Sequence, residues 1–553
     1  MDQAQLFDIL SRYDRRKKYF RLKDGSFLDV SDGQLRELSA LKNGLQISDR
    51  ELKKGKTQVP AYRAMYLDSQ LKGGDLIKVE KDNAFRALIR NMQTMEEHKF
   101  QIPKEQEKIL RGYQKEGFYW IKTLKHNQFG GILADDMGLG KTLQVITFLW
   151  SEFQESAPGE NRRALVITPA SLVFNWMNEI ERFAPGLPAT VVTGDVKERK
   201  ALIKNAGERE VLITSYDLLK RDLKAYQNLD FAVQIIDEAQ YIKNHGTQVA
   251  KAVKEIRSEF RLALTGTPVE NRLSELWSIF DFLMPGFLYS YEKFRKEIEL
   301  PAVQYSNSDA MERLQKMIRP FVLRRLKRDV LKDLPDKLEK DMFSPLESEQ
   351  KELYEAHTER LRLMLGMQSD VEFRTSKLQI LAEITRLRQI CCYPGLVYEG
   401  YKGNSSKLEM CMELVQNAVN GGHKILLFSQ FTTMLDVLAV RLKKAKISFY
   451  MLTGSTSKEK RAQMVQAFNE DDTSVFCISL KAGGTGLNLT AADIVIHYDP
   501  WWNLAVQNQA TDRAHRIGQQ NVVSVYRLFM KDTIEERIRA LQERKRELAD
   551  EIL

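Results

Sequence analysis

The segment from Gly130 to Thr142, GGILADDMGLGKT, places an apolar strand, a glycine-containing loop and a helix start in direct succession. Such a loop can turn its backbone N–H groups inward as an anion nest, so that Lys141 reaches the β- and γ-phosphates of a nucleotide and Thr142 binds Mg²⁺. Asp135 stands where the usual pattern G-x-x-x-x-G-K-[ST] begins with glycine. The motif favours a nucleotide site over an ordinary turn with an exposed lysine. The predicted nucleotide-binding residues here are Asp135, Met137, Gly138, Leu139, Gly140, Lys141 and Thr142.

The chain is long enough for more than one hydrophobic core, with 553 residues of which 43% are hydrophobic. No run of about 18 apolar residues and no signal peptide is found, so we expect a large soluble intracellular protein with no membrane partner. The four cysteines include one adjacent pair and no C-x-x-C, which favours reduced structural thiols over disulfides or a zinc site. The net charge of +9 suits either a solvated surface or a polyanion partner.

Apolar strand patterns alternate with helical patterns from Ile102 onward, which predicts a parallel sheet wrapped by helices. Between about Leu283 and Gly403 the strand patterns vanish and charged segments of helical period replace them. A second alternating series begins with HKILLFSQ. We therefore expect an α/β fold with two parallel-sheet lobes joined by a helical block. The expected divisions are an accessory region at 1–100, a first lobe at 101–285, helical insertions and a brace at 286–403, a second lobe at 404–535 and a C-terminal helix at 536–553.

The accessory region carries no chemical motif, and it contains a hairpin signal with Asp24 and Gly25 at the turn. It has the character of the tail of a longer accessory domain, and whether its beginning is missing is left open.

Two adjacent carboxylates, Asp237 and Glu238, follow the apolar strand FAVQIID. Ligands of α/β sheets bind at the carboxyl ends of the strands. Asp237 is therefore expected to hold Mg²⁺, and Glu238 to orient or deprotonate the water that attacks the γ-phosphate. At this distance from the phosphate loop, the pair is interpreted as a Walker B box rather than a turn.

From about Leu110 to about Glu536 the chain resembles the Swi/Snf-like ATPases, the double-stranded-DNA translocases of helicase superfamily 2. The loop DDMGLGKT is similar to the family's D-E-M-G-L-G-K-T, which makes Asp135 a family variant. The segment around Gln114 resembles the adenine-recognising Q element, which implies that Gln114 contacts adenine. The resemblance implies two RecA-like lobes. No appended reader module is recognised, and in this respect the chain resembles bacterial members of the family. Further matches in family order are TPASLVFNWMNE, ITSYD, DEAQYIKN, LTGTPVENRLSELWSIFDFLMPG, LRQICCYPGL, LLFSQFTTMLD, LTGST, SLKAGGTGLNLTAAD and QATDRAHRIGQ.

The resemblance also implies contacts with a nucleic-acid backbone. Hydroxyls, small residues and main-chain amides grip phosphates without reading bases, which permits stepping that is independent of sequence. Each of these residues could instead be a strand-end turn residue. The implied DNA-binding residues are Ser171, Thr214, Ser215, Ser429, Thr453, Lys481, Gly483 and Trp502, the last in DPWWNLA.

Arg513 and Arg516 are spaced to share one helix face with Gln509 and Asp512. A solvated amphipathic helix is one interpretation. The resemblance implies instead that both arginines are fingers that reach from the second lobe to phosphates held by the first and stabilise transition-state charge.

We therefore expect a DNA-dependent ATPase that uses ATP and Mg²⁺ to translocate along double-stranded DNA and remodel protein–DNA complexes. The expected partners are duplex DNA and DNA-bound proteins, and the chain is expected to be a monomer. Its place would be the cytoplasm, at the nucleoid, in a bacterium and the nucleus in a eukaryote. Two alternatives stay open, namely a strand-separating helicase or RNA-dependent ATPase, and a DNA clamp that is gated by ATP but does not hydrolyse it.

Overall fold

The computed structural model describes most of the chain after residue 100, namely residues 100–155, 160–269, 272–304, 308–331, 334–366, 370–483 and 487–552. Within the first hundred residues it describes 9–10, 19–21, 27–29, 38–39, 41–42, 44–45, 47–54, 57–72 and 80–94. The chain divides into two compact units. The first comprises residues 1–135, 141–324 and 552–553, and the second comprises residues 136–140 and 325–551.

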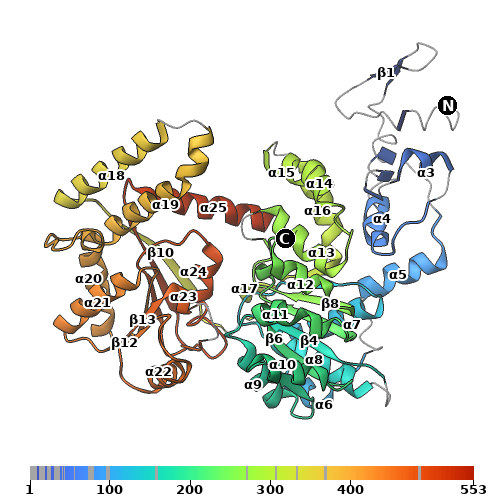
Figure 1. Ribbon diagram of the computed structural model, residues 1–553, viewed down its shortest axis with the longest axis horizontal. Coiled ribbons are helices and arrows are strands. Elements are labelled where there is room, and N and C mark those ends of the chain that lie inside the picture. The colour runs from blue at the N-terminus through green and yellow to red at the C-terminus, as the bar shows by residue number, and fades with distance from the viewer. Residues whose placement is uncertain are drawn as a thin grey trace. The chain divides into compact units, whose positions relative to one another are not determined.

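The first unit contains a seven-stranded sheet in the order β5-β6-β4-β7-β8-β3-β9, with every paired strand parallel (Figure 1). Helices connect the strands, as parallel pairing requires. Strands β4 and β6 are buried along their whole length, as expected for a sheet covered on both faces. The strands are β3 (Gly131–Leu133), β4 (Ala164–Thr168), β5 (Ala189–Val191), β6 (Val211–Ser215), β7 (Phe231–Asp237), β8 (Ser258–Leu264) and β9 (Val322–Leu323).

The α-helices of this unit follow the alternation predicted from the sequence and continue into a helical block after β8. They are α3 (Asp49–Lys54), α4 (Arg63–Lys72), α5 (Asn83–Thr94), α6 (Lys104–Glu107), α7 (Gly112–His126), α8 (Lys141–Glu155), α9 (Val173–Phe183), α10 (Val196–Lys204), α11 (Tyr216–Tyr226), α12 (Gln248–Glu255), α13 (Leu273–Leu283), α14 (Tyr291–Phe294), α15 (Leu300–Gln304) and α16 (Ser308–Ile318).

The second unit contains a six-stranded sheet in the order β10-β15-β14-β11-β13-β12, again with parallel pairs throughout. Helices α20 and α21 pack on one face of this sheet around Leu408, Leu435 and Leu427 (Figure 1). Phe468 of α22 and Ala510 of α24 pack with Phe476 in a second core cluster. The strands are β10 (Lys337–Ser344), β11 (Ile425–Ser429), β12 (Phe449–Leu452), β13 (Val475–Ser479), β14 (Ile494–His497) and β15 (Val523–Met530).

The α-helices of the second unit include two long ones, α18 and α19, where the charged helical segments were predicted. They are α17 (Lys327–Val330), α18 (Ser348–Gly366), α19 (Asp370–Cys392), α20 (Ser406–Asn420), α21 (Thr432–Lys444), α22 (Lys458–Glu470), α23 (Leu480–Gly483), α24 (Leu504–Thr511) and α25 (Ile534–Ile552). The α/β fold with two parallel-sheet lobes is confirmed.

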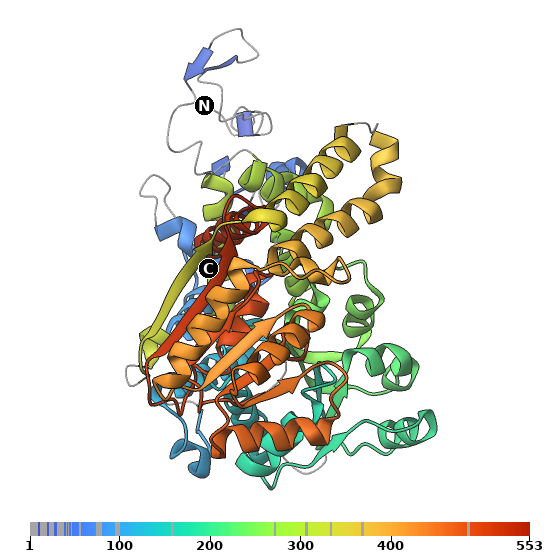
Figure 2. The same cartoon turned by 90° about the vertical axis from the view of Figure 1, so that its left-hand side faces the viewer.

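The prediction that strands vanish between Leu283 and Gly403 is wrong, because β9 and β10 lie there. Strand β10 pairs in parallel with β15 over its whole length, and Figure 2 shows the two long strands, olive and red, side by side. The sequence of β10, KLEKDMFS, is charged because this strand is the edge of the sheet. Asp341 forms ion pairs there with Arg527 and Arg539, which explains how charge is accommodated in a strand.

The predicted N-terminal hairpin is present, with Tyr19–Arg21 (β1) antiparallel to Phe27–Asp29 (β2). Its turn at Asp24 and Gly25 lies outside the described residues. Further along, the buried Arg63 at the start of α4 donates to the carbonyl of Phe287 at 2.5 Å and lies 4.7 Å from the ring centre of Tyr289. The accessory region thus packs on the helical block that follows β8. Among the described residues, no helix combines the length and apolar character needed to cross a membrane.

Candidate functional site

The phosphate loop leaves β3 at Leu133 and enters α8 at Lys141. Gly138 and Gly140 have φ angles of +83° and +73°, a region that glycine adopts without steric cost and that lets the loop turn its N–H groups inward. Asp135 is fully buried, and its side chain accepts a hydrogen bond from Gln144 of α8 at 3.2 Å. The Lys141 ammonium donates to the carbonyl of Asp135 at 2.5 Å. The aspartate that departs from the usual motif therefore fastens the loop to its helix.

Two further loop residues flank Lys141. Leu139 is fully buried, and Thr142 follows Lys141 in the first turn of α8. Gln114 lies at the start of α7, where its Oε1 accepts from the N–H of Arg111 at 2.9 Å.

The Walker B carboxylates lie at the carboxyl end of β7, as predicted. Oδ2 of Asp237 accepts from the indole N–H of Trp176 at 2.8 Å and from the hydroxyl of Thr168 at 3.2 Å. Oδ1 accepts from the backbone N–H of Glu238 at 2.9 Å. Burial raises the pKa of Asp237, whereas these hydrogen bonds and the charge of Lys141 oppose that rise.

Glu238 has the left-handed backbone conformation, with φ of +53°, which is strained for a residue with a side chain. Its carboxylate accepts from Gln240 at 2.7 Å, and Gln240 in turn accepts from Thr265 at 3.1 Å. The N–H of Thr267 donates to the Thr265 hydroxyl at 3.0 Å. Gln240 was not predicted as a site residue, yet its amide joins Glu238 to the turn that follows β8, because an amide donates and accepts at once.

Oxygen donors suit Mg²⁺, and the Thr142 hydroxyl and the Asp237 carboxylate would each supply a donor of this kind. Among the described residues there is no cluster of three or more His, Cys, Asp or Glu that could hold a metal by themselves. Mg²⁺ commonly binds through one or two protein oxygens together with nucleotide phosphates and water. The four cysteines are buried and free.

The prediction that Asp512, Arg513 and Arg516 lie on one helix face is wrong, because α24 ends at Thr511. The segment after it forms turns whose backbone bonds to other parts of the second unit. The carbonyl of Arg513 accepts from the N–H of Leu489 at 3.1 Å, and that of Ala514 accepts from Gln519 at 3.1 Å. The carbonyls of Arg513 and Ala514 thus have partners outside a continuing helix, and both arginines are partly exposed on this turn.

Lys327 of α17 holds the same turn. Its ammonium donates to Oδ1 of Asp512 and to the carbonyl of His515, each at 2.6 Å. Its backbone N–H donates to Oδ2 of Asp136 at 2.9 Å. Burial lowers the pKa of Lys327, and the charge of Asp512 opposes that effect. Lys327 lies in the charged region between Leu283 and Gly403 that the sequence indicated, but its buried role depends on partners far along the chain.

The residues with implied DNA contacts fall into two groups. Thr214, Ser215 and Ser429 are buried at the ends of β6 and β11. Ser215 caps α11 by accepting from Leu218 N–H at 3.3 Å. Ser429 donates to Asp499 at 2.6 Å. These three geometries favour the strand-end role, which the sequence left open.

The second group lies in turns and in one short helix. Ser171 is exposed just before α9, and Thr453 is partly exposed after β12, where its hydroxyl bonds to Ser455 at 2.9 Å. Lys481 and Gly483 belong to the short helix α23. Their role as DNA contacts stays a prediction.

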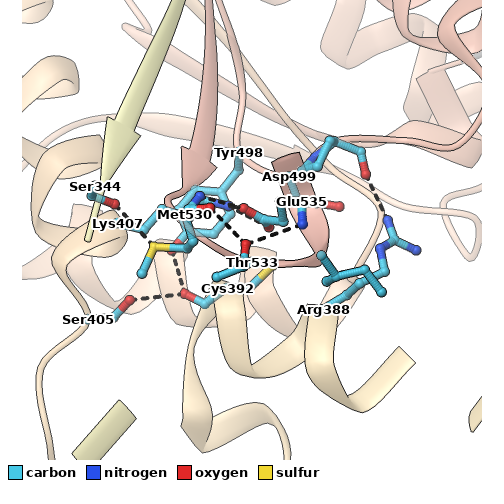
Figure 3. Close-up of polar contacts among 12 residues, drawn as sticks. Ser344, Arg388, Cys392, Ser405, Lys407, Tyr498, Asp499, Met530, Thr533 and Glu535 are labelled. Atoms are coloured by element: carbon cyan, nitrogen blue, oxygen red, sulfur yellow. Dashed lines mark hydrogen bonds and ion pairs between the residues drawn. The ribbon is translucent and has the colours of Figure 1, made fainter. Parts of the chain in front are cut away.

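Trp502 and its neighbour Trp501 lie against the buried guanidinium of Arg388, whose central carbon is 5.4 Å and 5.9 Å from the two ring centres. Arg388, whose side chain Figure 3 shows, belongs to α19. It donates to the carbonyl of Pro500 at 2.7 Å. Cation–π contacts of this kind fix aromatic rings on a surface. Gln542 of α25 adds a hydrogen bond to the carbonyl of Trp501. Arg388 belongs to the motif LRQICC, but sequence spacing gave no sign of this contact.

A buried polar network lies beside Arg388 (Figure 3). Lys407 of α20 and Glu535 of α25 are 0% and 1% exposed, and the ammonium donates to both carboxylate oxygens at 2.7 Å. The N–H of Met530 also donates to Glu535 at 2.8 Å. Tyr498 donates to the carbonyl of Cys392 at 2.8 Å. These bonds join α20, α25 and β15, and they join α19 to Tyr498, which directly precedes the DPWWN segment.

The combination of two parallel-sheet lobes, a phosphate loop and a Walker B box defines a nucleoside-triphosphate hydrolase of the helicase type. Residues 113–396 match the SNF2-related domain, and residues 406–518 match the helicase conserved C-terminal domain. The chain therefore belongs to the SWI2/SNF2 family of helicase superfamily 2. Residues 1–103 match a domain described as bacterial SNF2 helicase associated.

The chain is similar to an uncharacterized ATP-dependent helicase of Mycoplasma pneumoniae, with 41% identity over 84% of this chain and 44% of the relative. It is 39% identical to the putative ATP-dependent helicase/translocase YwqA of Bacillus subtilis, over 86% of this chain and 52% of that protein. The solved SWI2/SNF2 ATPase core of Sulfolobus solfataricus in complex with dsDNA is 37% identical, with a TM-score of 0.41, over 80% of this chain and 92% of that one. The chain spans about half the length of these two curated relatives.

Proposed function

We propose that this chain is a DNA-dependent ATPase that couples hydrolysis of Mg²⁺·ATP to translocation along double-stranded DNA and so remodels protein–DNA complexes. The observation that carries the proposal is that one chain combines a phosphate loop and Walker B carboxylates with a second parallel-sheet lobe that carries an arginine turn and a tryptophan pair. The similarity to a putative helicase/translocase supports it.

The residues divide the chemistry among them. Lys141 neutralises phosphate charge, Asp237 and Thr142 hold Mg²⁺, and Glu238 orients the attacking water, held in place by Gln240. Bound Mg²⁺ supplies charge neutralisation at the phosphates. Arg513 and Arg516 stabilise the charge that develops in the transition state, an effect worth about 10³ to 10⁵ in rate when an arginine finger is in place.

The candidate contacts that are at least partly exposed are Ser171, Thr453 and Trp502, which combine small hydroxyls with one aromatic ring. Hydroxyls bind backbone phosphates without reading sequence, and an indole can stack or wedge beside a groove. This composition suits a motor that follows a strand irrespective of its bases.

The test is a triplex-displacement assay run beside a fork-unwinding assay with the same protein and ATP concentrations. Displacement of a triplex strand without fork unwinding is the expected result. Unwinding of a fork without triplex displacement would establish a strand-separating helicase instead. Equally slow hydrolysis by the wild type and Glu238→Gln at saturating duplex DNA would establish a clamp that does not turn over.

A further inference from the structure

The two carboxylate oxygens of Asp237 accept different numbers of hydrogen bonds. A carboxylate has about four lone-pair sites, two on each oxygen. Oδ2 receives two hydrogen bonds, from Trp176 and Thr168, whereas Oδ1 receives one, from the N–H of Glu238. The main-chain carbonyl of the same residue accepts from Tyr216 at 2.7 Å. One lone-pair site, on Oδ1, is left for a further ligand.

Trp176 is committed to this contact. It is 1% exposed in the first turns of α9, and its indole N–H can only donate. Thr168 is fully buried at the end of β4, the strand next to β7. Both donors therefore come from parts of the first sheet and its covering helix that cannot easily move away from the carboxylate.

We propose that Trp176 is a positioning residue for the magnesium-binding carboxylate: together with Thr168 it saturates Oδ2 of Asp237 and so presents Oδ1 to the cation. The inference rests on the proposed function in one respect, namely that Asp237 is the Mg²⁺ ligand. It assigns a role to a tryptophan of the segment TPASLVFNWMNE, which was noted in the sequence only for a backbone contact at Ser171.

The physical reason is orientation. A carboxylate that accepts hydrogen bonds on one oxygen cannot rotate freely, so the other oxygen keeps a fixed direction. Partners that orient a metal ligand in this way typically affect metal affinity or activity by about 10- to 100-fold. Loss of the indole N–H would let Asp237 rotate and would leave Thr168 as the single side-chain donor on Oδ2.

The experiment measures binding of Mn²⁺, as a spin-active substitute for Mg²⁺, to the protein–ADP complex by electron paramagnetic resonance. Trp176→Phe removes the N–H and part of the ring. A second variant carries 3-benzothienylalanine at position 176, which keeps the bicyclic shape and replaces N–H by sulfur, so that a folding defect of the smaller phenylalanine does not decide the result. The control is Trp277→Phe, because Trp277 is also buried and donates its N–H to a main-chain carbonyl, that of Tyr289, at 3.1 Å.

We expect both Trp176 variants to bind Mn²⁺ about 10-fold or more weakly in the presence of ADP. ADP affinity measured in EDTA should stay within about 2-fold of wild type, because the phosphate loop is untouched, and Trp277→Phe should bind Mn²⁺ like the wild type. Unchanged Mn²⁺ affinity in the benzothienyl variant would overturn the inference, as would a wild type that binds no Mn²⁺. A wild type that binds Mn²⁺ but shows no DNA stimulation would overturn the proposed function alone.

Discussion

The ammonium of Lys327 lies 2.6 Å from Oδ1 of Asp512, and both groups lie inside the second unit. The same ammonium reaches the carbonyl of His515. Asp512 and His515 directly precede Arg513 and Arg516, so one buried cation fixes the turn that carries both arginines. The position of the arginines therefore depends on a tertiary ion pair more than on helix geometry.

Replacement of Lys327 by Met should lower kcat of the ATPase by about 10-fold or more while KM for ATP changes little. The change leaves Asp512 without its cation and frees the turn, and misplaced catalytic groups cost rate more than ground-state binding. Steady-state kinetics with saturating duplex DNA measure both constants. Lys220→Met, which removes an exposed pair with Asp217, is the control and should leave both constants unaltered. A wild-type kcat for Lys327→Met would contradict the role of this ion pair.

Replacement of Lys407 by Met should destabilise the second unit by about 3–5 kcal/mol, because Glu535 would keep an uncompensated charge in the interior. The double variant Lys407→Met/Glu535→Met should recover most of that loss, since a well-packed apolar pair can replace a buried ion pair. Scanning calorimetry is the suitable measurement because the two units need not unfold together. Lys351→Met, at an exposed pair with Glu355, should leave the transition unshifted. If the double variant were as unstable as Lys407→Met alone, the destabilisation would come from loss of the hydrogen-bond network and not from the unpaired charge of Glu535.

The folded state should become less stable in acid because His497 is buried in its neutral form. Burial lowers the pKa of His497 to about 3, and the ring is held against Phe428 and bonded to Thr511. In the unfolded chain the His497 imidazole is protonated below about pH 6.5, whereas in the folded protein it stays neutral. The free energy of unfolding therefore decreases as the pH falls from about 6.5 toward 3. The loss is about 2 kcal/mol between pH 7.5 and pH 5.

His497→Gln removes this titration, so its second-unit transition should depend less steeply on pH than that of the wild type. Calorimetry at pH 7.5 and pH 5.0 gives the comparison, and the difference between the two proteins cancels the contribution of other groups. Parallel pH dependence would mean that His497 is not the group responsible.

Lys481→Ala should weaken binding to duplex DNA and make the salt dependence shallower by about one unit of log–log slope, as expected for one lost phosphate contact. Lys141→Ala should show the complementary pattern, with nucleotide binding abolished and DNA affinity kept. Fluorescence anisotropy with labelled duplex over a salt series measures the DNA affinity and its slope, and anisotropy of a fluorescent ATP analogue measures nucleotide binding. An unchanged slope would remove Lys481 from the DNA contacts.

Much of the fold could be predicted from the sequence, because strands buried on both faces are continuous apolar runs, as in β4 and β13. Strand β10 was not predicted because it is a charged edge strand. Its charges, such as that of Asp341, are neutralised by arginines from β15 and α25. The end of α24 at Thr511 was also not predicted. The carbonyls of the turn that follows it accept hydrogen bonds from Leu489, Gln519 and Lys327, which the sequence does not indicate.

The candidate site could be predicted where a chemical motif directly follows an apolar strand, as at Lys141 and Asp237. Residues that act through those groups, such as Trp176 and Gln240, carry no motif of their own. One signal was present for Trp176: a buried indole N–H needs an acceptor, and Trp176 lies on the apolar side of an amphipathic helix.

The most direct test of the central claim is the steady-state ATPase rate of the chain measured without nucleic acid and with saturating duplex DNA, single-stranded DNA or RNA, with Glu238→Gln as the inactive reference. We predict strong stimulation by duplex DNA, much weaker stimulation by the two single-stranded polymers and no turnover by Glu238→Gln under any condition. A rate that is the same with and without duplex DNA, or one that RNA raises more than duplex DNA does, would contradict the account.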